Sequence, residues 1–249
     1  IFLLFVLNHA FGQQRALFLV AGQSNAVGQG NEKESVKCSS GTAFEYRFDG
    51  DSLMGLQDPF GCNELHFQKA HTGSAWPAFA ETYSRLTGRK IVLVQAARGG
   101  SSCHSKAELP GDGTWDENGN LPLFENAVMK TKAAMKHTGL KLSAILWSQG
   151  ERDANAINSN QLLATEYQEV LEKLIRRFRE KLGKDLDFYI IETGYYLNHT
   201  EKGFDEVRKI QESITKKMKR VFIVYGNTSE FEKRGWMKDE IHYNQTALN

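Results

Sequence analysis

Four short segments of the chain contain the residue types that nucleophilic acyl transfer requires. They are, in chain order, GQSN at 22–25, RGGS at 98–101, QGERD at 149–153 and DEIH at 239–242. Together they supply a serine, a histidine, carboxylates, side-chain amides and glycines. Whether these groups act together depends on whether the fold brings the four segments to one place.

Ser24, His242 and Asp239 are the candidates for the bond-making steps. A serine hydroxyl is a weak nucleophile until a base removes its proton, and histidine has a pKa suited to that role near neutral pH. The imidazole in turn needs a carboxylate that fixes its tautomer and stabilises its cation. Asp239 lies three residues before His242, so the two side chains can pair on one short loop. We therefore predict a triad of Ser24, His242 and Asp239.

Amide groups can supply the donors for the oxyanion that such a reaction creates. If Ser24 begins a helix, its own N–H is free to donate. Gly99 or Gly100 would let a second backbone N–H approach the same point, and the side chain of Gln149 is a candidate third donor. The sequence leaves the choice between the two glycines open.

The same residues also have simpler interpretations. A serine after a strand often only caps the next helix, and Asp239 with His242 can form an ordinary surface pair. Glu151 and Asp153 can stabilise the start of a helix by complementing its dipole. None of these interpretations explains why polar segments end several strands at once, so we favour the catalytic one.

Apolar runs between and before the polar segments predict buried strands. They occupy 16–22, 90–97, 142–150, 187–194 and 220–227. Amphipathic stretches of helical period lie between them, at 76–86, 124–135, 163–178 and 204–218. Continuous apolar strands that alternate with amphipathic helices predict an α/β fold, a three-layer αβα sandwich around a parallel sheet of about five strands.

Two long segments, 28–75 and 101–120, interrupt this alternation. Long loops in a compact domain are usually functional or disordered. In an open parallel sheet, ligands bind beyond the carboxyl ends of the strands. Both segments follow such an end, so we expect them to form walls of the site.

The four polar segments resemble, in order, the characteristic blocks of the SGNH hydrolases. More narrowly, they resemble the branch formed by carbohydrate esterase family 6 and the sialate O-acetylesterases. The resemblance runs from Phe18 to Tyr243 and rests on GQSN, GGS, QGExD and DxxH. It implies a flavodoxin-like SGNH fold, with Ser24 as nucleophile, His242 as general base and Asp239 as its orienting acid. It also implies removal of acetyl groups from sugars without metal or cofactor, the substrate being an acetylated carbohydrate such as acetylated xylan or O-acetyl sialic acid.

Five further residues are candidates for supporting the site or contacting substrate: Gln23, Asn25, Arg98, Glu151 and Trp115. We expect Glu151 to brace the loop that carries Gln149. For Arg98 the alternatives are a substrate contact and an ion pair with Glu151. For Trp115 they are stacking on a sugar ring and anchoring its loop.

The two ends of the chain carry expectations about processing. Residues 1–12 resemble the apolar region and cleavage site of a secretory signal peptide, and their apolar run is too short to span a membrane. We expect a truncated signal peptide over 1–14 rather than a buried first strand, a secreted or periplasmic protein, and one esterase domain over 15–249. Only seven residues follow His242, where such folds usually continue into a final helix, so we expect a C-terminally truncated domain.

Charge and cysteine content narrow the range of partners. The 31 Lys and Arg residues nearly balance the 30 Asp and Glu residues, so no basic field favours nucleic acid. Cys38, Cys62 and Cys103 are compatible with one disulfide and one free thiol, and no CxxC spacing favours zinc. We accordingly expect no nucleic acid, membrane or metal ion as a partner.

Two other functions remain open at this point. One is a sugar-binding module that has the same fold but no turnover. The other is a lipase-like or thioester hydrolase that uses the same triad. Acetate release from acetylated xylan, acetylated sialic acid and aryl acetates would distinguish them.

Overall fold

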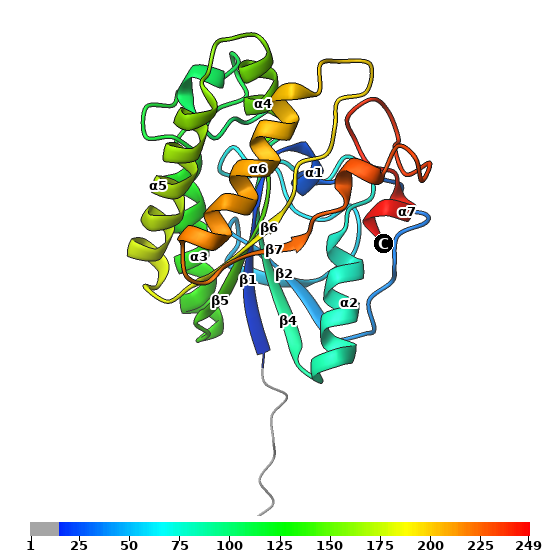
Figure 1. Ribbon diagram of the computed structural model, residues 1–249. Coiled ribbons are helices and arrows are strands. Elements are labelled where there is room, and N and C mark those ends of the chain that lie inside the picture. The colour runs from blue at the N-terminus through cyan, green and yellow to red at the C-terminus, as the bar shows by residue number, and fades with distance from the viewer. Residues whose placement is uncertain (1–14) are drawn as a thin grey trace, which may run out of the picture.

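A computed structural model of the chain describes residues 15–249, and the expected signal peptide over 1–14 lies outside the described residues. Figure 1 shows a central sheet with helices on both faces. The sheet has seven strands in the order β3-β2-β4-β1-β5-β6-β7. The predicted three-layer αβα sandwich is confirmed, with two more strands than the sequence analysis expected.

The strands follow the apolar runs closely. They are β1 (Arg15–Gly22), β2 (Ala43–Arg47), β3 (Ser52–Gly55), β4 (Lys90–Ala97), β5 (Leu142–Ser148), β6 (Asp187–Ile191) and β7 (Val221–Tyr225). Neighbouring strands run parallel except β2 and β3, which are antiparallel. In the register of the central strands, Gly22 lies beside Ala97 on β4 and beside Ser148 on β5. Three of the four polar segments therefore begin at one edge of the sheet.

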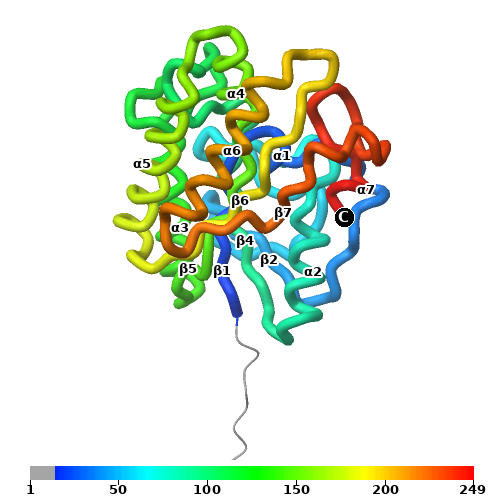
Figure 2. The backbone as a smooth tube through the Cα atoms, viewed as in Figure 1, coloured from blue at the N-terminus to red at the C-terminus, as the bar shows by residue number. Residues whose placement is uncertain are grey.

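Seven α-helices connect and cover these strands within the described residues. They are α1 (Ser24–Val27), α2 (Trp76–Thr87), α3 (Leu123–Thr138), α4 (Glu151–Asn158), α5 (Ala164–Leu182), α6 (Lys202–Lys217) and α7 (Gln245–Leu248). The tube in Figure 2 shows α3, α5 and α6 on one side of the sheet and α2 on the other, with α7 near the upper end of α2. Most positions of the stripes predicted from the sequence lie on the buried faces of the long helices, as on α5, where Tyr167, Leu171, Ile175 and Phe178 are fully buried. Leu86 and Leu163, at the ends of two stripes, are instead 71% and 64% exposed.

Side chains that alternate along the strands divide the core into two halves. On β1, Leu17, Leu19 and Ala21 belong to the cluster beneath α3, α5 and α6, whereas Phe18 and Val20 belong to the cluster beneath α2. This period of two is the consequence of strand geometry in a sheet buried on both faces. Both halves of the core contact β1, which makes it a rigid support for the residues that follow Gly22.

The two additional strands, β2 and β3, lie inside the segment 28–75. The abundance of Gly, Ser, Asn and Asp in this segment predicts a loop, and β2 is only five residues long and contains the charged residues Glu45 and Arg47. Tertiary pairing with β4 and β3 stabilises it where local pattern gives little signal. Glu151 and Asp153 lie in the first turn of a short helix of their own, α4, which ends before α5 begins at Ala164.

The three cysteines, which are compatible in number with one disulfide, form none among the described residues, and Cys38, Cys62 and Cys103 are all free thiols. The sheet explains part of this result. Cys103 is buried in the core half beneath α3 and α5, whereas Cys38 packs against the opposite half beneath α2. A disulfide between these two would have to cross the central layer, which its short reach does not allow.

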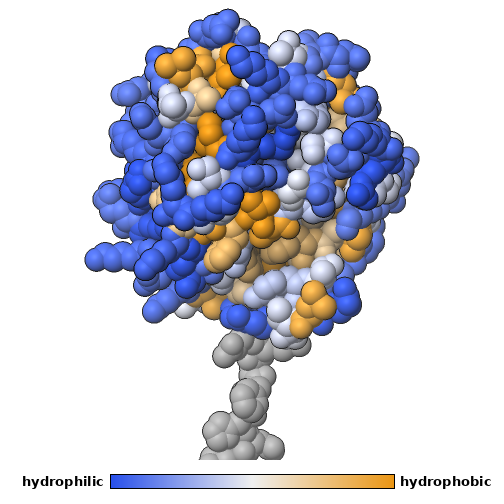
Figure 3. Space-filling view, viewed as in Figure 1, coloured by the Kyte–Doolittle hydropathy of each residue, from blue (hydrophilic) through white to orange (hydrophobic). Residues whose placement is uncertain are grey.

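The surface view in Figure 3 shows an apolar hollow on the face that carries β7 and α2. Its exposed apolar side chains include Leu86 on α2 and Phe222, Val224 and Tyr225 on the edge strand β7. Among residues 15–249, no helix has both the length and the apolar character that crossing a membrane requires.

Candidate active site

Ser24, His242 and Asp239 lie together as a hydrogen-bonded chain, although Ser24 and His242 are 218 positions apart in sequence. His242 Nε2 is 3.0 Å from Ser24 Oγ, and His242 Nδ1 is 2.9 Å from Asp239 Oδ2. Ser24 and the His242 side chain keep some exposure, at 9% and 23% respectively, so the hydroxyl borders solvent. These distances suit transfer of a proton from the hydroxyl to the imidazole.

The position of Ser24 is determined by the close approach of β1 and β5. Gly22 has a φ of +136°, and a Cβ added to it would lie 2.0 Å from the carbonyl oxygen of Ser148. Only glycine fits there, and the next residue, Gln23, donates its N–H to the same oxygen at 2.9 Å. Trp76 then fixes the short helix α1 by donating its indole N–H to Ala26 O at 2.6 Å. The strand-to-helix turn that carries Ser24 is therefore rigid.

The carboxylate of Asp239 is held by its own loop. Its Oδ1 accepts the N–H groups of Ile241 at 2.9 Å and His242 at 2.8 Å, while Oδ2 faces the imidazole. Partial burial acts to raise the pKa of Asp239, but these hydrogen bonds outweigh it and hold the pKa below its ordinary value. Asp239 is thus anionic near neutral pH, as a partner for an imidazolium must be.

Asn25 joins this loop to the helix α4. Its Nδ2 donates to Glu151 Oε1 at 2.8 Å and to the carbonyl oxygen of Ile241 at 3.3 Å. Glu151 is 1% exposed, and burial raises its pKa, although the hydrogen bond from Asn25 acts in the opposite direction. Glu151 therefore supports Asn25, and through Asn25 it also supports the loop that carries His242. The sequence predicts support only for the loop that carries Gln149.

Gln23 links the first and third polar segments. Its Oε1 accepts the N–H groups of Gly150 at 3.3 Å and Arg152 at 3.2 Å, at the start of α4. The first N–H groups of a helix have no partner within it, so Gln23 supplies an acceptor for them. Gln23 is 3% exposed, so its side chain supports the site from the protein interior and does not contact solvent.

The Gln149 side chain is placed differently from the sequence prediction. Its Nε2 donates to Asp153 Oδ2 at 2.5 Å and also faces Gln23 Oε1 and Ser101 O, each at 3.3 Å. These acceptors use both N–H groups, and the residue is 1% exposed. In this structure Gln149 therefore has no free N–H for an oxyanion, because its side-chain amide donates to the buried carboxylate of Asp153 and to two other oxygens.

Of the two candidate glycines, Gly99 is the one beside the nucleophile. A Cβ added to Gly99 would lie 3.8 Å from Ser24 Cβ, whereas the atoms around Gly100 belong to Asp112. The N–H of Gly99 donates to the side-chain oxygen of Gln68 at 2.7 Å. Gln68 lies in none of the four polar segments, and its sequence surroundings carry no signal that would have singled it out.

Arg98 does not pair with Glu151. Its guanidinium donates to three backbone oxygens, those of Asp112 at 2.8 Å, His66 at 2.7 Å and Gly111 at 2.5 Å. These bonds join the segment 101–120 to the segment 28–75. Both segments therefore meet near the end of β4.

Trp115 is an anchor and not a sugar platform. It is fully buried, it packs edge-on against Trp147 at 5.2 Å between ring centroids, and it donates its indole N–H to Ser101 Oγ at 3.2 Å. Of the two alternatives, stacking on a sugar is thus excluded. The large apolar side chain holds the segment 101–120 onto the core.

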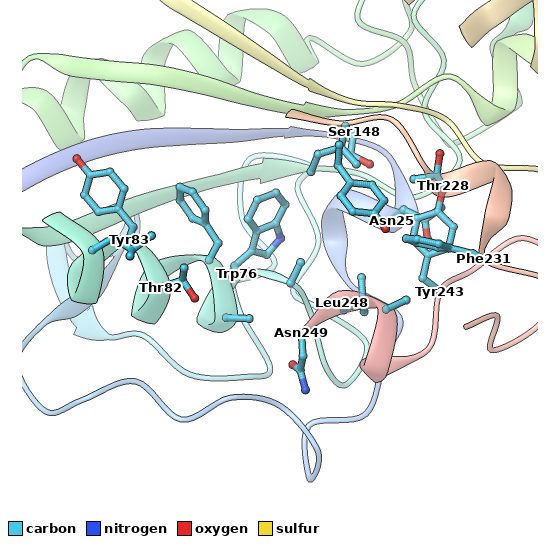
Figure 4. Close-up of a pocket in the computed structure, with 17 residues that line it drawn as sticks. Asn25, Trp76, Thr82, Tyr83, Ser148, Thr228, Phe231, Tyr243, Leu248 and Asn249 are labelled. Carbon is cyan, nitrogen blue, oxygen red and sulfur yellow. The ribbon is translucent and has the colours of Figure 1, made fainter. Parts of the chain in front are cut away.

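A groove of about 480 Å³ lies between α2 and the strand ends (Figure 4). Trp76 and Tyr83 of α2 lie toward one end, and Phe231 and Tyr243 lie toward the other. Asn25 lines the groove, but neither Ser24 nor His242 does. Within residues 15–249, no group of three or more His, Cys, Asp or Glu side chains is arranged to hold a metal ion.

An αβα sandwich with polar side chains gathered beyond its strand ends defines the class of α/β enzymes that bind ligands at that edge. A family model described as "Carbohydrate esterase, sialic acid-specific acetylesterase" matches residues 14–249. The chain belongs to this family, and its resemblance to the sialate O-acetylesterase branch is confirmed. It is thus a carbohydrate esterase.

Solved structures with the same fold show the same architecture at low sequence identity. A protein from Arabidopsis thaliana has a TM-score of 0.72 at 20% identity, over 95% of this chain and 93% of that one. NanS has a TM-score of 0.63 at 16% identity, over the same shares. A carbohydrate acetylesterase from Xanthomonas citri has a TM-score of 0.53 at 16% identity, over 84% of this chain and 49% of that one. No match was found among curated protein sequences.

Proposed function

We propose that this protein removes O-acetyl groups from carbohydrates by transferring the acetyl group to Ser24. The observation that carries the proposal is the hydrogen-bonded chain from Ser24 through His242 to Asp239, with distances of 3.0 and 2.9 Å. Its place beyond the strand ends of a carbohydrate esterase fold supports a role in that family's chemistry.

In the first half of the proposed reaction, Ser24 Oγ attacks the acetyl carbonyl carbon while His242 Nε2 takes the hydroxyl proton. The tetrahedral intermediate collapses as the C–O bond to the sugar breaks, and the imidazolium returns the proton to the departing sugar oxygen. In the second half, His242 Nε2 removes a proton from water as the water oxygen attacks the acetyl carbonyl carbon. The bond from that carbon to Ser24 Oγ then breaks, the imidazolium returns the proton to Ser24 Oγ, and acetic acid leaves. Asp239 remains anionic throughout and stabilises the imidazolium.

The proposed donors to the oxyanion are the backbone N–H groups of Ser24 and Gly99. Ser24 is the first residue of α1, where a helical N–H lacks an intrahelical acceptor. Of Gly99 and Gly100, only Gly99 has the Ser24 side chain among its nearest neighbours. Fixed donors of this type lower the barrier because they are oriented before charge develops.

Among acetylated sugars, we propose O-acetyl sialic acid as the first substrate to test, because the family is described as sialic acid-specific. Acetate release should be measured on O-acetyl sialic acid, acetylated xylan and p-nitrophenyl acetate in parallel. Release from xylan but not from sialic acid would reverse the substrate order and retain the reaction.

The nucleophile is tested by Ser24→Ala. We expect this variant to release no acetate and to resist labelling by a fluorophosphonate, because the attacking oxygen is missing. Its melting temperature should change little, since one small hydroxyl at the border of solvent contributes little to stability. Equal labelling of the wild type and Ser24→Ala, measured by intact-protein mass, would overturn the assignment.

The other two functions give different outcomes in the same assays. A binding module would bind acetylated sugars in calorimetry without acetate release. A lipase-like enzyme would prefer p-nitrophenyl octanoate to p-nitrophenyl acetate. This longer ester is worth testing because the mostly apolar groove reaches Asn25, the residue next to Ser24.

A further inference from the structure

Gln68 places a side-chain carbonyl oxygen against the N–H of Gly99, one of the two proposed oxyanion donors. Its Oε1 accepts the N–H of Gly99 at 2.7 Å. A Cβ added to Gly99 would lie 2.9 Å from this oxygen and 3.8 Å from Ser24 Cβ. Gly99 therefore has both the end of the Gln68 side chain and the side chain of Ser24 as close neighbours.

This contact occupies a donor that a bound acyl oxygen would need, the N–H of Gly99. Donors that stabilise an oxyanion lie about 2.7–3.1 Å from the oxygen that they stabilise, and the Gln68 oxygen is at such a distance from Gly99 N. Like an acetyl ester, the Gln68 side chain ends in an sp² carbonyl with a planar substituent. An N–H pointing at one oxygen cannot serve a second one at full strength.

The backbone of Gln68 is fixed independently of its side chain. The N–H of Gln68 donates to Ala97 O at 3.0 Å, and its carbonyl oxygen accepts Gln95 Nε2 at 2.6 Å. In contrast, within the part of the chain that the structure describes, the side-chain Nε2 of Gln68 has no hydrogen-bond acceptor, and the residue is half-buried. The side chain can therefore rotate away without disturbing the fold.

We propose that the Gln68 side chain occupies the acyl-oxygen position of the free enzyme and that the acetyl carbonyl displaces it on binding. Gln68 is then an internal competitor of the substrate and not a donor in the reaction. This inference rests on the proposed acyl transfer at Ser24. Its consequence is that Gln68 weakens substrate binding while leaving the chemical step unchanged.

The test compares the wild type with Gln68→Ala, Gln68→Glu and the control Lys69→Ala, an exposed neighbour whose side chain lies outside the site. Loss of one neutral hydrogen bond should lower KM about three- to tenfold in Gln68→Ala with kcat unchanged. In Gln68→Glu a charged acceptor holds Gly99 more strongly, so KM should rise by at least about threefold. Lys69→Ala should match the wild type.

Fluorophosphonate labelling provides a readout that does not depend on the sugar, because the phosphoryl oxygen needs the same position. Gln68→Ala should be labelled several-fold faster than the wild type, and Gln68→Glu more slowly. The Gly99 amide proton, followed by NMR, should shift upfield in Gln68→Ala as its hydrogen bond is lost.

The outcomes separate this inference from the proposed function. Faster labelling of Gln68→Ala without acetate release from any sugar would retain the inference and reject the function. Acetate release with equal kinetic constants in the wild type and Gln68→Ala, or a loss of kcat in that variant, would overturn the inference and retain the function. Failure of the fluorophosphonate to label any of these proteins, together with no acetate release from any substrate, would overturn both.

Discussion

At the scale of single residues, the side chains around Ser24 are held by partners that are distant in the sequence. Asn25 contacts Glu151, which is 126 positions away, and the carbonyl oxygen of Ile241, which is 216 positions away. A residue adjacent to the nucleophile therefore also positions the loop that carries the base. The side chain of Glu151 has one oxygen, Oε2, with no partner among the described residues.

Substitution of Glu151 should separate shape from charge. Glu151→Gln retains an acceptor for Asn25, so we expect it to keep most of the activity. Glu151→Ala leaves a cavity and an unpaired amide, so we expect lower thermal stability together with lower kcat, at a cost of about 2–4 kcal/mol. Melting curves and kinetics on p-nitrophenyl acetate would check both variants. Loss of activity in Glu151→Gln at unchanged stability would instead indicate that the ionised carboxylate takes part in the reaction.

The pH dependence of the reaction should reflect the base and not Asp239. Burial acts to raise the pKa of Asp239, but hydrogen bonds from Ile241 and His242 outweigh it and hold the pKa below its ordinary value, so the carboxylate is charged near neutral pH. Its contribution to the folded state is accordingly present at neutral pH and is lost only in stronger acid. We therefore expect the acid limb of kcat/KM to fit a single protonation. A second protonation between pH 4 and 6 that disappears in Asp239→Asn would contradict this assignment.

At the scale of elements, the start of α4 holds the segment 101–120 in place. Asp153 is fully buried, and its carboxylate accepts the N–H groups of Cys103 at 2.8 Å and His104 at 2.9 Å as well as the amide of Gln149. Burial raises the pKa of Asp153, and these three hydrogen bonds act against that change. The segment 101–120 is thus fastened to α4 through one carboxylate.

Gln149→Ala tests whether Gln149 supports Asp153 or donates to the oxyanion, as the sequence predicts. A donor to the oxyanion would cost about 10²–10³ in kcat with unchanged stability. Because the amide contacts Asp153 instead, we expect a lower melting temperature and a loss of kcat that follows the loss of structure. Asn155→Ala on the neighbouring helix α4 serves as a control. A kcat loss of that size with an unchanged melting curve would restore Gln149 to the oxyanion site.

Much of the element order was predictable, since long apolar runs and amphipathic stripes report burial directly. The run over 90–97 coincides with β4, and the stripes at 76–86 and 163–178 lie on α2 and α5. The residues of the hydrogen-bonded chain were also predictable, because their types and spacing carry chemistry. The orientation of Gln149 and the contact of Gln68 were not, since both depend on partners that only the folded chain brings near. A side-chain amide gives no sequence signal of which acceptor it will find.

At the scale of the whole molecule, the two faces of the sheet differ. The face covered by α3, α5 and α6 carries the larger part of the core, whereas the other face has α2 and an apolar groove beside β7. Phe222 and Val224 on β7 remain 44% and 52% exposed. The side chains that determine chemistry therefore lie at one edge of the sheet, and the apolar hollow lies over one of its faces.

Glu192 offers a test of how the fold responds to pH. It follows β6, is 4% exposed, and has a pKa raised to about 7, first by burial and then by the nearby charge of Glu212, with Arg208 opposing both. The folded state thus retains this proton up to about pH 7, whereas the unfolded chain loses it near the ordinary value of 4.5. The free energy of unfolding should therefore fall as the pH rises between these values, and the loss should be constant at higher pH.

Glu192→Gln removes this loss because the amide is neutral at every pH. We expect the variant to be more stable than the wild type by about 1–3 kcal/mol at pH 8 and nearly equal to it at pH 5. Thermal or urea unfolding at the two pH values would measure the difference, with the exposed Glu232→Gln as a control that should show no such dependence. A stabilisation of equal size at both pH values would show that the gain comes from packing or hydrogen bonding of the amide and not from the ionisation of Glu192.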